Sequence, residues 1–520
     1  MFINEKKIIW TLVIILFSLY FFNLKSDYLS FPNDVRLYDE SDSLEKGLNF
    51  SFGEKLQDGY FYFSFYKFLS FFENNNVDLY FLMYYCLFSS LIVGIALGTK
   101  IAYNKFVHVV IYLLYFVFFL MSPSIIQVWP FITIFSSLLL SILLLVSNNK
   151  NCYIFLPLLT FVLVFTRPEF ILSFYLTLIF IIFYIWKHFD SIPKKNYFYF
   201  IPFLVLLLAI VIFYNPTKGS RSIIAFGQHY SLRLALNGTI SVDPWTNWES
   251  VLLDHFQEKD SLIKIVTNHP EKFLRHVAEN IGGCVVEISN VLNLDIPFTI
   301  VLLIFVYIFS FCLGLYQLIF SRETKYLSVV AWVLSLPPLI GVLLIFPRTH
   351  YILQLSVPFL YMMYETFEFL FSKIKLKKVH YVFFLSIFVW VSLDQIYLKA
   401  KGKQYDLNNP CSNISLAFIL NNTHLDGIKF LTTRGRICMY YKGSCEDIRE
   451  YNKNSSFDAF VNNNNINLIL LDKALINDSR FVNDFEFKNF LKNNYSTQQY
   501  SFKPLKVWNC SNQVLLRRDN

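Results

Sequence analysis

The run IIWTLVIILFSLYFFNL, from Ile8 to Leu24, is the first of many long apolar stretches in this chain and decides its fold class. It follows Lys6 and Lys7, and no small-residue cleavage site comes after it. We therefore interpret it as a retained signal anchor with a cytoplasmic N-terminus. The acidic stretch DVRLYDESD, from Asp34 to Asp42, lies just beyond its outer end. The sequence thus predicts a membrane protein with carboxylates beside its first span.

The composition agrees with this class. Of the 520 residues, 55% are hydrophobic and 16% are charged, against roughly 25% charged in an ordinary soluble domain. The net charge of +8 does not indicate a nucleic-acid partner, because membrane proteins collect lysines in their cytoplasmic loops. We expect the lipid bilayer as a partner and no nucleic acid.

Hydropathy and the placement of basic loops predict a polytopic all-α membrane domain of about eleven transmembrane helices over residues 1–396. The fifth and sixth expected spans are short, and together they could instead form one long broken element. The expected spans are Ile8 to Leu24, Val77 to Gly98, Phe106 to Met121, Trp129 to Val146, Cys152 to Thr166, Phe170 to Trp186, Phe198 to Tyr214, Phe298 to Phe320, Leu327 to Phe346, Tyr351 to Phe371 and Tyr381 to Ile396.

An odd number of spans places three long segments outside the cytoplasm. Residues 25–76 carry the acidic stretch and then an aromatic run, Tyr60 to Phe72, which predicts a helix lying in the membrane interface. Residues 215–297 form a polar mid-chain loop with helical stretches. Residues 397–520 predict a small soluble extracytoplasmic α/β domain.

That tail alternates helical and strand-like pieces. Residues Ile414 to Asn421 and Phe481 to Asn493 predict helices, whereas Ile428 to Thr432, Ile466 to Leu471 and Gln513 to Leu516 predict strands.

The tail also holds four of the eight cysteines. An even number of cysteines in an exported domain favours disulfides, and we prefer the pairs Cys438 with Cys445 and Cys411 with Cys510 among three pairings. No CxxC spacing is present, so zinc is not expected.

Four acidic residues of the first outer loop, Asp34, Asp39, Glu40 and Asp42, are candidates for chemistry. The simple interpretation is a solvated acidic loop. The alternative is a partly desolvated carboxylate near the bilayer, whose raised basicity would suit general-base work on a hydroxyl.

Two basic motifs are predicted at the same outer face. Arg167, in the motif TRPE, could close a tight turn by pairing with Glu169 or could bind a phosphate, for which guanidinium geometry is suited. For Arg348 and His350, in the motif FPRTHY, we favour phosphate binding over the alternative, in which the side chains only extend to the polar membrane interface.

The order of these features resembles the GT-C superfamily of polytopic glycosyltransferases, in particular bacterial relatives of protein O-mannosyltransferases and of aminoarabinose lipid A transferases. The resemblance rests on the signal anchor, the outer loop with LYDE, the interfacial aromatics, the mid-chain RPE, the later PRTHY and the soluble tail. It covers Ile8 to about Phe371.

The resemblance implies a sugar donor linked to a polyisoprenyl phosphate and a general base in the first outer loop. The resemblance implies that Asp39 is the first candidate for this general base and Glu40 the second. It also implies that the donor phosphate is bound by Arg167, Arg348 and His350. No cofactor is required, although some relatives bind a divalent cation at this loop, for which Asp42 is the candidate.

The expected function is transfer of the sugar, with inversion, to a hydroxyl of an envelope glycolipid, glycan or protein. The expected place is the periplasmic face of a bacterial inner membrane.

Two other functions stay open. An O-antigen polymerase or ligase would use the mid-chain loop, where Arg221, His229 or Arg233 would matter and Asp39 would not. A non-catalytic transporter or scaffold would show ionisable groups near mid-span and internal repeats, and neither is clear in the sequence.

Overall fold

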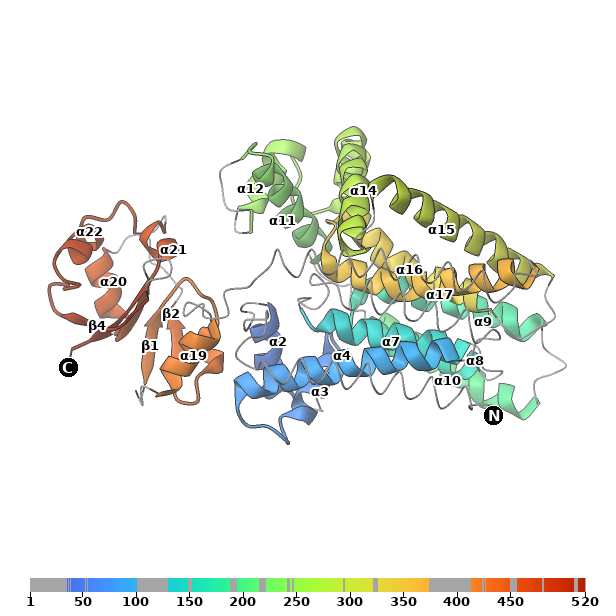
Figure 1. Ribbon diagram of the computed structural model, residues 1–520, viewed down its shortest axis with the longest axis horizontal. Helices are drawn as coiled ribbons and strands as arrows, with labels where there is room; N and C mark the ends of the chain where they lie inside the picture. Colours follow the sequence, from blue (N-terminus) through green and yellow to red (C-terminus); the bar gives the residue numbers. More distant parts are fainter. Residues whose placement is uncertain are drawn as a thin grey trace, which may run out of the picture. The chain divides into compact units, whose positions relative to one another are not determined.

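The computed structural model describes residues 35, 37, 39–51, 53, 55–100, 130–147, 152–187, 194–214, 221–240, 244–245, 247–292, 295–320, 326–373, 413–422, 425, 427–448, 456–478, 481–508 and 513–519 (Figure 1). The chain divides into two compact units. The first takes in Gly53–Tyr62 and Cys86–Lys403, and the second takes in Leu19–Phe52, Phe63–Tyr85 and Gln404–Asn520.

The first unit is a bundle of helices. Its centre is the pair α16 and α17, against which α7 and α15 pack. The helix α8 packs between α7 and α9, and α14 packs on α16. Its described elements are α7 (Ile132–Ser147), α8 (Cys152–Val164), η2 (Pro168–Phe170), α9 (Ile171–Lys187), α10 (Lys194–Phe213), α11 (Arg221–Leu236), α12 (Trp248–Phe256), α13 (Leu262–Asn268), α14 (Pro270–Leu292), α15 (Ile296–Ile319), α16 (Leu327–Leu344) and α17 (Thr349–Lys373).

Within the described part of the chain, four helices are long and apolar enough to cross a membrane: Asn76–Ile95, Pro168–Lys187, Ile296–Ile319 and Leu327–Leu344. The apolar helices of the sequence are therefore present, but the expected number of eleven spans is not reached. Three expected spans, Ile8 to Leu24, Phe106 to Met121 and Tyr381 to Ile396, lie outside the described residues.

Helix length explains part of the difference. With 16 and 13 residues, α7 and α8 measure only ~24 Å and ~20 Å, shorter than a hydrocarbon core of ~30 Å. A break also separates α8 from α9, because Pro168 has no N–H to donate and holds Arg167 in an extended conformation (φ −140°, ψ 108°). The fifth and sixth expected spans are thus two helices rather than one.

The helix α15 has the outer surface expected of a lipid-facing element. Val301, Ile304 and Ile308 are each more than half exposed, and their spacing places them on one side of the helix. The opposite side is buried at Val306, Ser310 and Leu313.

The second unit contains the α/β fold of the tail together with α2 (Asp39–Leu48) and the parts of α3 (Tyr60–Leu69) and α4 (Asn76–Lys100) that lie in this unit. The elements of the tail are α19 (Asn413–Asn422), β1 (Ile428–Leu431), η4 (Ile437–Tyr440), β2 (Cys445–Ile448), α20 (Phe457–Asn463), β3 (Leu468–Leu471), α21 (Lys473–Ile476), α22 (Phe485–Lys492), β4 (Phe502–Trp508) and β5 (Gln513–Arg518).

Five strands form a sheet in the order β2-β1-β3-β5-β4. The strands β2, β1 and β3 run parallel, and β5 runs antiparallel to β3 and to β4. The helices α20 and α22 lie together beside the sheet (Figure 1), where a cluster of phenylalanines packs on Leu431, Ile469 and Leu516. Every helix and strand expected in the tail is present, and β2, β4, α20, α21 and the 3-10 helix η4 are additional.

The aromatic run that follows the acidic stretch forms the expected helix. It is α3, and beyond its end Phe71 and Phe72 are 69% and 70% exposed. Such exposed aromatic rings suit a membrane interface.

Candidate functional site

The acidic pair Asp39 and Glu40 divides between exposure and burial. Both residues begin α2, where carboxylates are favoured by the positive end of the helix dipole. The Asp39 side chain is exposed, whereas Glu40 is fully buried and its Oε1 accepts a hydrogen bond of 2.5 Å from the Tyr66 hydroxyl. Of the two predicted bases, Asp39 is therefore accessible and Glu40 joins α2 to α3.

A close approach of backbone supports that join. A Cβ at Gly47 would lie 2.3 Å from the Cβ of Tyr66, so only glycine fits where α2 crosses α3. The Lys67 ammonium donates to the Leu48 carbonyl, 2.7 Å away, at the end of α2.

The predicted metal ligand Asp42 is bound by cations of the protein itself. Its Oδ2 lies 2.7 Å from the Lys46 Nζ, and its Oδ1 lies 2.6 Å from a terminal nitrogen of Arg436. Among the described residues, no group of three His, Cys, Asp or Glu side chains is placed to hold a metal ion. The surroundings of Asp42 thus do not fit a cation ligand.

In the first unit, Arg167 lies at the break between α8 and α9. It is 5% exposed, and its guanidinium binds Glu169 with nitrogen–oxygen distances of 2.5 Å. The ion pair considered from the sequence is therefore present. The same guanidinium lies over the ring of Tyr351, 5.5 Å from its centre, which links Arg167 to the start of α17.

The other two predicted phosphate-binding residues stand at the start of that helix. The Arg348 carbonyl accepts from the Tyr351 and Ile352 amides, so Arg348 directly precedes the first turn of α17. Its guanidinium lies 5.2 Å from the ring centre of Trp245. The His350 ring contacts Tyr351 and interacts electrostatically with both Arg167 and Arg348. Arg167, Arg348 and His350, which we call the basic cluster, are therefore close together.

The structure adds His229 to these surroundings. This side chain of α11 is 9% exposed, contacts the rings of Trp245 and Phe346, and interacts electrostatically with Arg348. Burial and the Arg348 charge lower the pKa of His229 to about 4. Its Nδ1 lies 2.7 Å from the Ala225 carbonyl, so Nδ1 carries the proton of the neutral ring.

Only the polymerase or ligase hypothesis pointed to His229 from the sequence. The available signal is its spacing of four residues from Arg233, which places both side chains on one face of a helix. Nothing in the sequence marks that face as neighbouring the distant motif FPRTHY.

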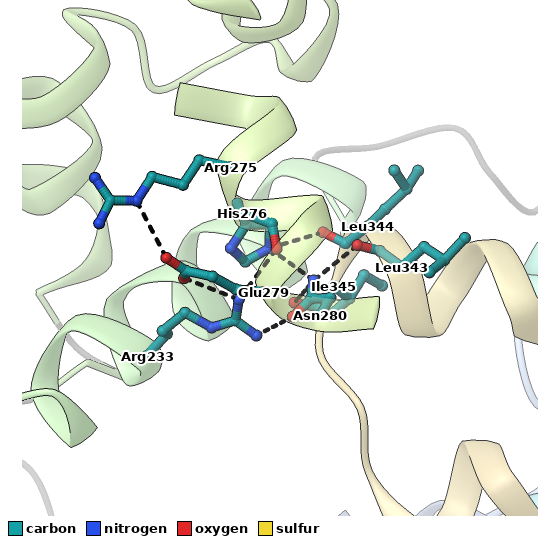
Figure 2. A network of polar contacts seen from close by, with 8 residues as sticks. All are labelled: Arg233, Arg275, His276, Glu279, Asn280, Leu343, Leu344 and Ile345. Atoms are coloured by element: carbon teal, nitrogen blue, oxygen red, sulfur yellow. Dashed lines mark hydrogen bonds and ion pairs between the residues drawn. The ribbon is translucent and has the colours of Figure 1, made fainter. Parts of the chain in front are cut away.

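A polar network on α14 holds the segment that carries Arg348 (Figure 2). The last carbonyls of a helix have no partner within the helix. At the end of α16, Asn280 donates its side-chain amide to the Leu343 carbonyl at 2.7 Å, and the His276 Nε2 lies 3.2 Å from the Leu344 carbonyl. Side chains of α14 thus satisfy the end of α16.

Arg233 completes the network from α11. One terminal nitrogen donates to the His276 carbonyl at 3.0 Å and to Glu279 at 3.2 Å, and the other donates to the Asn280 Oδ1 (Figure 2). Its guanidinium also lies over the ring of Phe346, 5.3 Å from the centre. The chain between α16 and α17 is therefore fixed from two neighbouring helices.

In the second unit, Cys438 and Cys445 form a disulfide with their Cα atoms 5.3 Å apart, which is the pairing preferred from the sequence. It joins η4 to β2. The other preferred pair, Cys411 and Cys510, lies outside the described residues.

Comparison with known proteins adds no assignment, since no protein-family model matches the chain and no curated protein matches its sequence significantly.

Replacing Asn280 with alanine should destabilise the first unit. The Leu343 carbonyl and Arg233 would each lose a partner next to a fully buried side chain, at a cost of roughly 1–3 kcal/mol for such a group. Thermal unfolding of the purified protein should show a clearly lower midpoint for Asn280→Ala than for Leu274→Ala, at a position of the same helix that is 63% exposed. Equal midpoints would contradict the role of Asn280.

The folded protein should become less stable as the pH is lowered from about 6.5 to 4. Burial lowers the pKa of His276, like that of His229, to about 4, from an ordinary value near 6.5. In this window the unfolded chain binds protons that the folded chain does not, so lowering the pH favours unfolding. The unfolding midpoint should drop between pH 7 and pH 5, and by less in His276→Gln. An equal drop in both proteins would show that His276 does not contribute.

Proposed function

We propose that this chain is a membrane glycosyltransferase that moves a sugar from a polyisoprenyl-phosphate donor to a hydroxyl of an envelope acceptor. The observation that carries the proposal is the basic cluster, because Arg167 and Arg348 come from distant parts of the sequence and meet at the start of α17. They do so in a bundle with membrane-crossing helices. A phosphate linked to a membrane lipid requires cationic groups beside membrane-crossing helices.

The chemistry of the cluster suits a phosphate rather than a neutral ligand. Guanidinium groups bind phosphate oxygens with paired hydrogen bonds, and the N-terminal end of α17 adds partial positive charge beside Arg348. The Glu169 carboxylate balances one of the two arginines. In the proposed reaction the cluster stabilises the negative charge on the departing polyisoprenyl phosphate.

The proposed base is Asp39. It takes the proton of the acceptor hydroxyl while the hydroxyl oxygen attacks the anomeric carbon, and the bond from that carbon to the phosphate oxygen breaks. The single displacement inverts the anomeric centre. Glu40 is second in this role, because its burial and its hydrogen bond to Tyr66 make it part of the support for α2.

The proposal also includes the finer topology. The shorter apolar helices, Ile132–Ser147, Phe155–Val164 and Phe200–Phe213, would complete the crossing of the membrane together with the long ones. The N-terminus would be cytoplasmic, and the tail with its disulfide would face the oxidising periplasm. The membrane would be a bacterial inner membrane.

One observation favours the second candidate, an O-antigen polymerase or ligase. The charge of Arg348 acts on His229, which that function would use. A pKa of about 4 leaves its Nε2 free of a proton at neutral pH, but makes it a weak base. Its neutral ring suits hydrogen bonding to a substrate better than proton abstraction.

Turnover of radiolabelled polyisoprenyl-phosphate sugars by the purified full-length protein tests both candidates. Loss of a general base lowers rates by about 10²–10⁴, so Asp39→Asn should lower kcat by that factor with little change in KM for the donor. Glu40→Gln keeps an acceptor for Tyr66 and should have a smaller effect. Full turnover in Asp39→Asn, also when combined with Glu40→Gln, would contradict the proposal. Activity that depends on His229 but not on Asp39 would select the second candidate.

A further inference from the structure

The segment Arg436–Tyr440 of the tail contacts the acidic helix of the first outer loop, within the second unit. Arg436 follows β1 and adopts a left-handed backbone conformation with φ of 62°, which is uncommon for a residue with a side chain. Its two terminal nitrogens reach different carboxylates, Asp42 at 2.6 Å and Glu45. One arginine therefore binds two carboxylates that lie three residues apart on α2.

The rest of the segment holds the start of α4. The Asn76 side-chain amide donates to the Met439 carbonyl at 2.6 Å. One turn later, Tyr80 packs edge-on against Tyr440, with ring centres 6.1 Å apart and both side chains almost fully buried. The segment is thus anchored to two helices that flank the predicted interfacial helix.

The disulfide stiffens this segment at its middle. Cys438 lies two residues after Arg436, and its bond to Cys445 ties η4 to the neighbouring strand β2. A cross-link restricts the conformations open to the chain around it. A second contact lies nearby, where the Asn413 side chain donates to the Val35 carbonyl at 2.9 Å and accepts from Arg434 at 3.0 Å.

We propose that the segment Arg436–Tyr440 positions α2 and that Arg436 is a positioning residue for Asp39. The effect of Arg436 on catalysis rests on the proposed function, whereas its effect on the order of α2 does not. A ten-residue helix is marginal in water by itself, so α2 depends on contacts made by its sides. One such contact is the buried Glu40 bond, and Arg436 supplies another.

The ion pairs are partly exposed, with side-chain exposures of 32% for Arg436, 30% for Asp42 and 43% for Glu45. Exposed pairs contribute little to global stability. Their expected effect is local, because a misplacement of about 1 Å at a reacting group can cost about 100-fold in rate. Arg436 should therefore matter more for kcat than for the unfolding temperature.

Hydrogen exchange of the full-length protein in lipid nanodiscs tests the structural part. In Arg436→Ala, amides of residues 39–48 should exchange about fivefold faster, because the loss of one network of ion pairs favours local opening. Arg436→Lys should give an intermediate rate. The matched control is Lys503→Ala, which removes an exposed ion pair with Asp519 in the same fold and should leave α2 unchanged.

Protection of β3 and β5 shows whether a variant has kept its fold. If Arg436→Ala loses it, the double variant Asp42→Asn, Glu45→Gln removes the same contact from the side of the helix and should speed exchange in residues 436–440. Unchanged exchange of α2 in a folded Arg436→Ala protein would overturn the proposal.

Turnover tests the catalytic part. Arg436→Ala should lower kcat about 10- to 100-fold with an unchanged KM for the donor, and Arg436→Lys should restore part of it. Normal kcat in the folded variant would overturn the positioning role. Faster exchange of α2 in a protein whose wild type transfers no sugar would contradict the proposed function alone.

Discussion

The end of α16 imposes the constraint on which the candidate site depends. Its last carbonyl groups need hydrogen-bond donors, and the side chains of Asn280 and His276 provide them from α14. Arg233 orients Asn280 and covers Phe346. Because these contacts fix the chain that leaves α16, they also determine where α17 begins and where Arg348 stands. The helix α14 also approaches the segment between α16 and α17 closely at Gly283, where a Cβ would lie 2.8 Å from the Pro347 ring.

The second unit uses a different device for its acidic helix. There, a tyrosine hydroxyl binds the buried Glu40, and an arginine of the tail binds Asp42 and Glu45 on another part of the helix. The two neighbouring acidic residues Asp39 and Glu40 thereby acquire different roles, one exposed and one structural. Within the second unit, the exposed Asp39 therefore stands next to a buried carboxylate that ties its helix to α3.

Much of this fold could be predicted from hydropathy and periodicity. The apolar helices and the strand β3, which is buried along its whole length, carry continuous apolar runs. The missed strands β2 and β4 are the two edges of the sheet, where Glu446, Asp447, Lys503 and Lys506 interrupt any apolar pattern. Within the described chain, fewer long apolar helices are present than hydropathy predicts, in part because the helices at two expected spans, α7 and α8, end after 16 and 13 residues.

The candidate site was predictable in part. Unusual charges in apolar surroundings drew attention to Arg167 and Arg348, and those two residues do lie near each other with His350. The burial of Glu40 was not predictable, because it depends on Tyr66, 26 residues away. The same is true of His229 and of the Asn280 network, whose partners come from helices that only the fold brings together.

The most direct test of the central claim is the affinity of the full-length protein for a polyisoprenyl phosphate in lipid nanodiscs. Hydrogen bonds to charged groups contribute about 1.5–3 kcal/mol each, so Arg348→Gln should raise Kd by about 10- to 100-fold, and Arg167→Gln should also raise it. The control Arg275→Gln removes an arginine whose side chain is 83% exposed on α14 and should leave Kd unchanged. Equal affinity in all four proteins would contradict a phosphate site at the basic cluster.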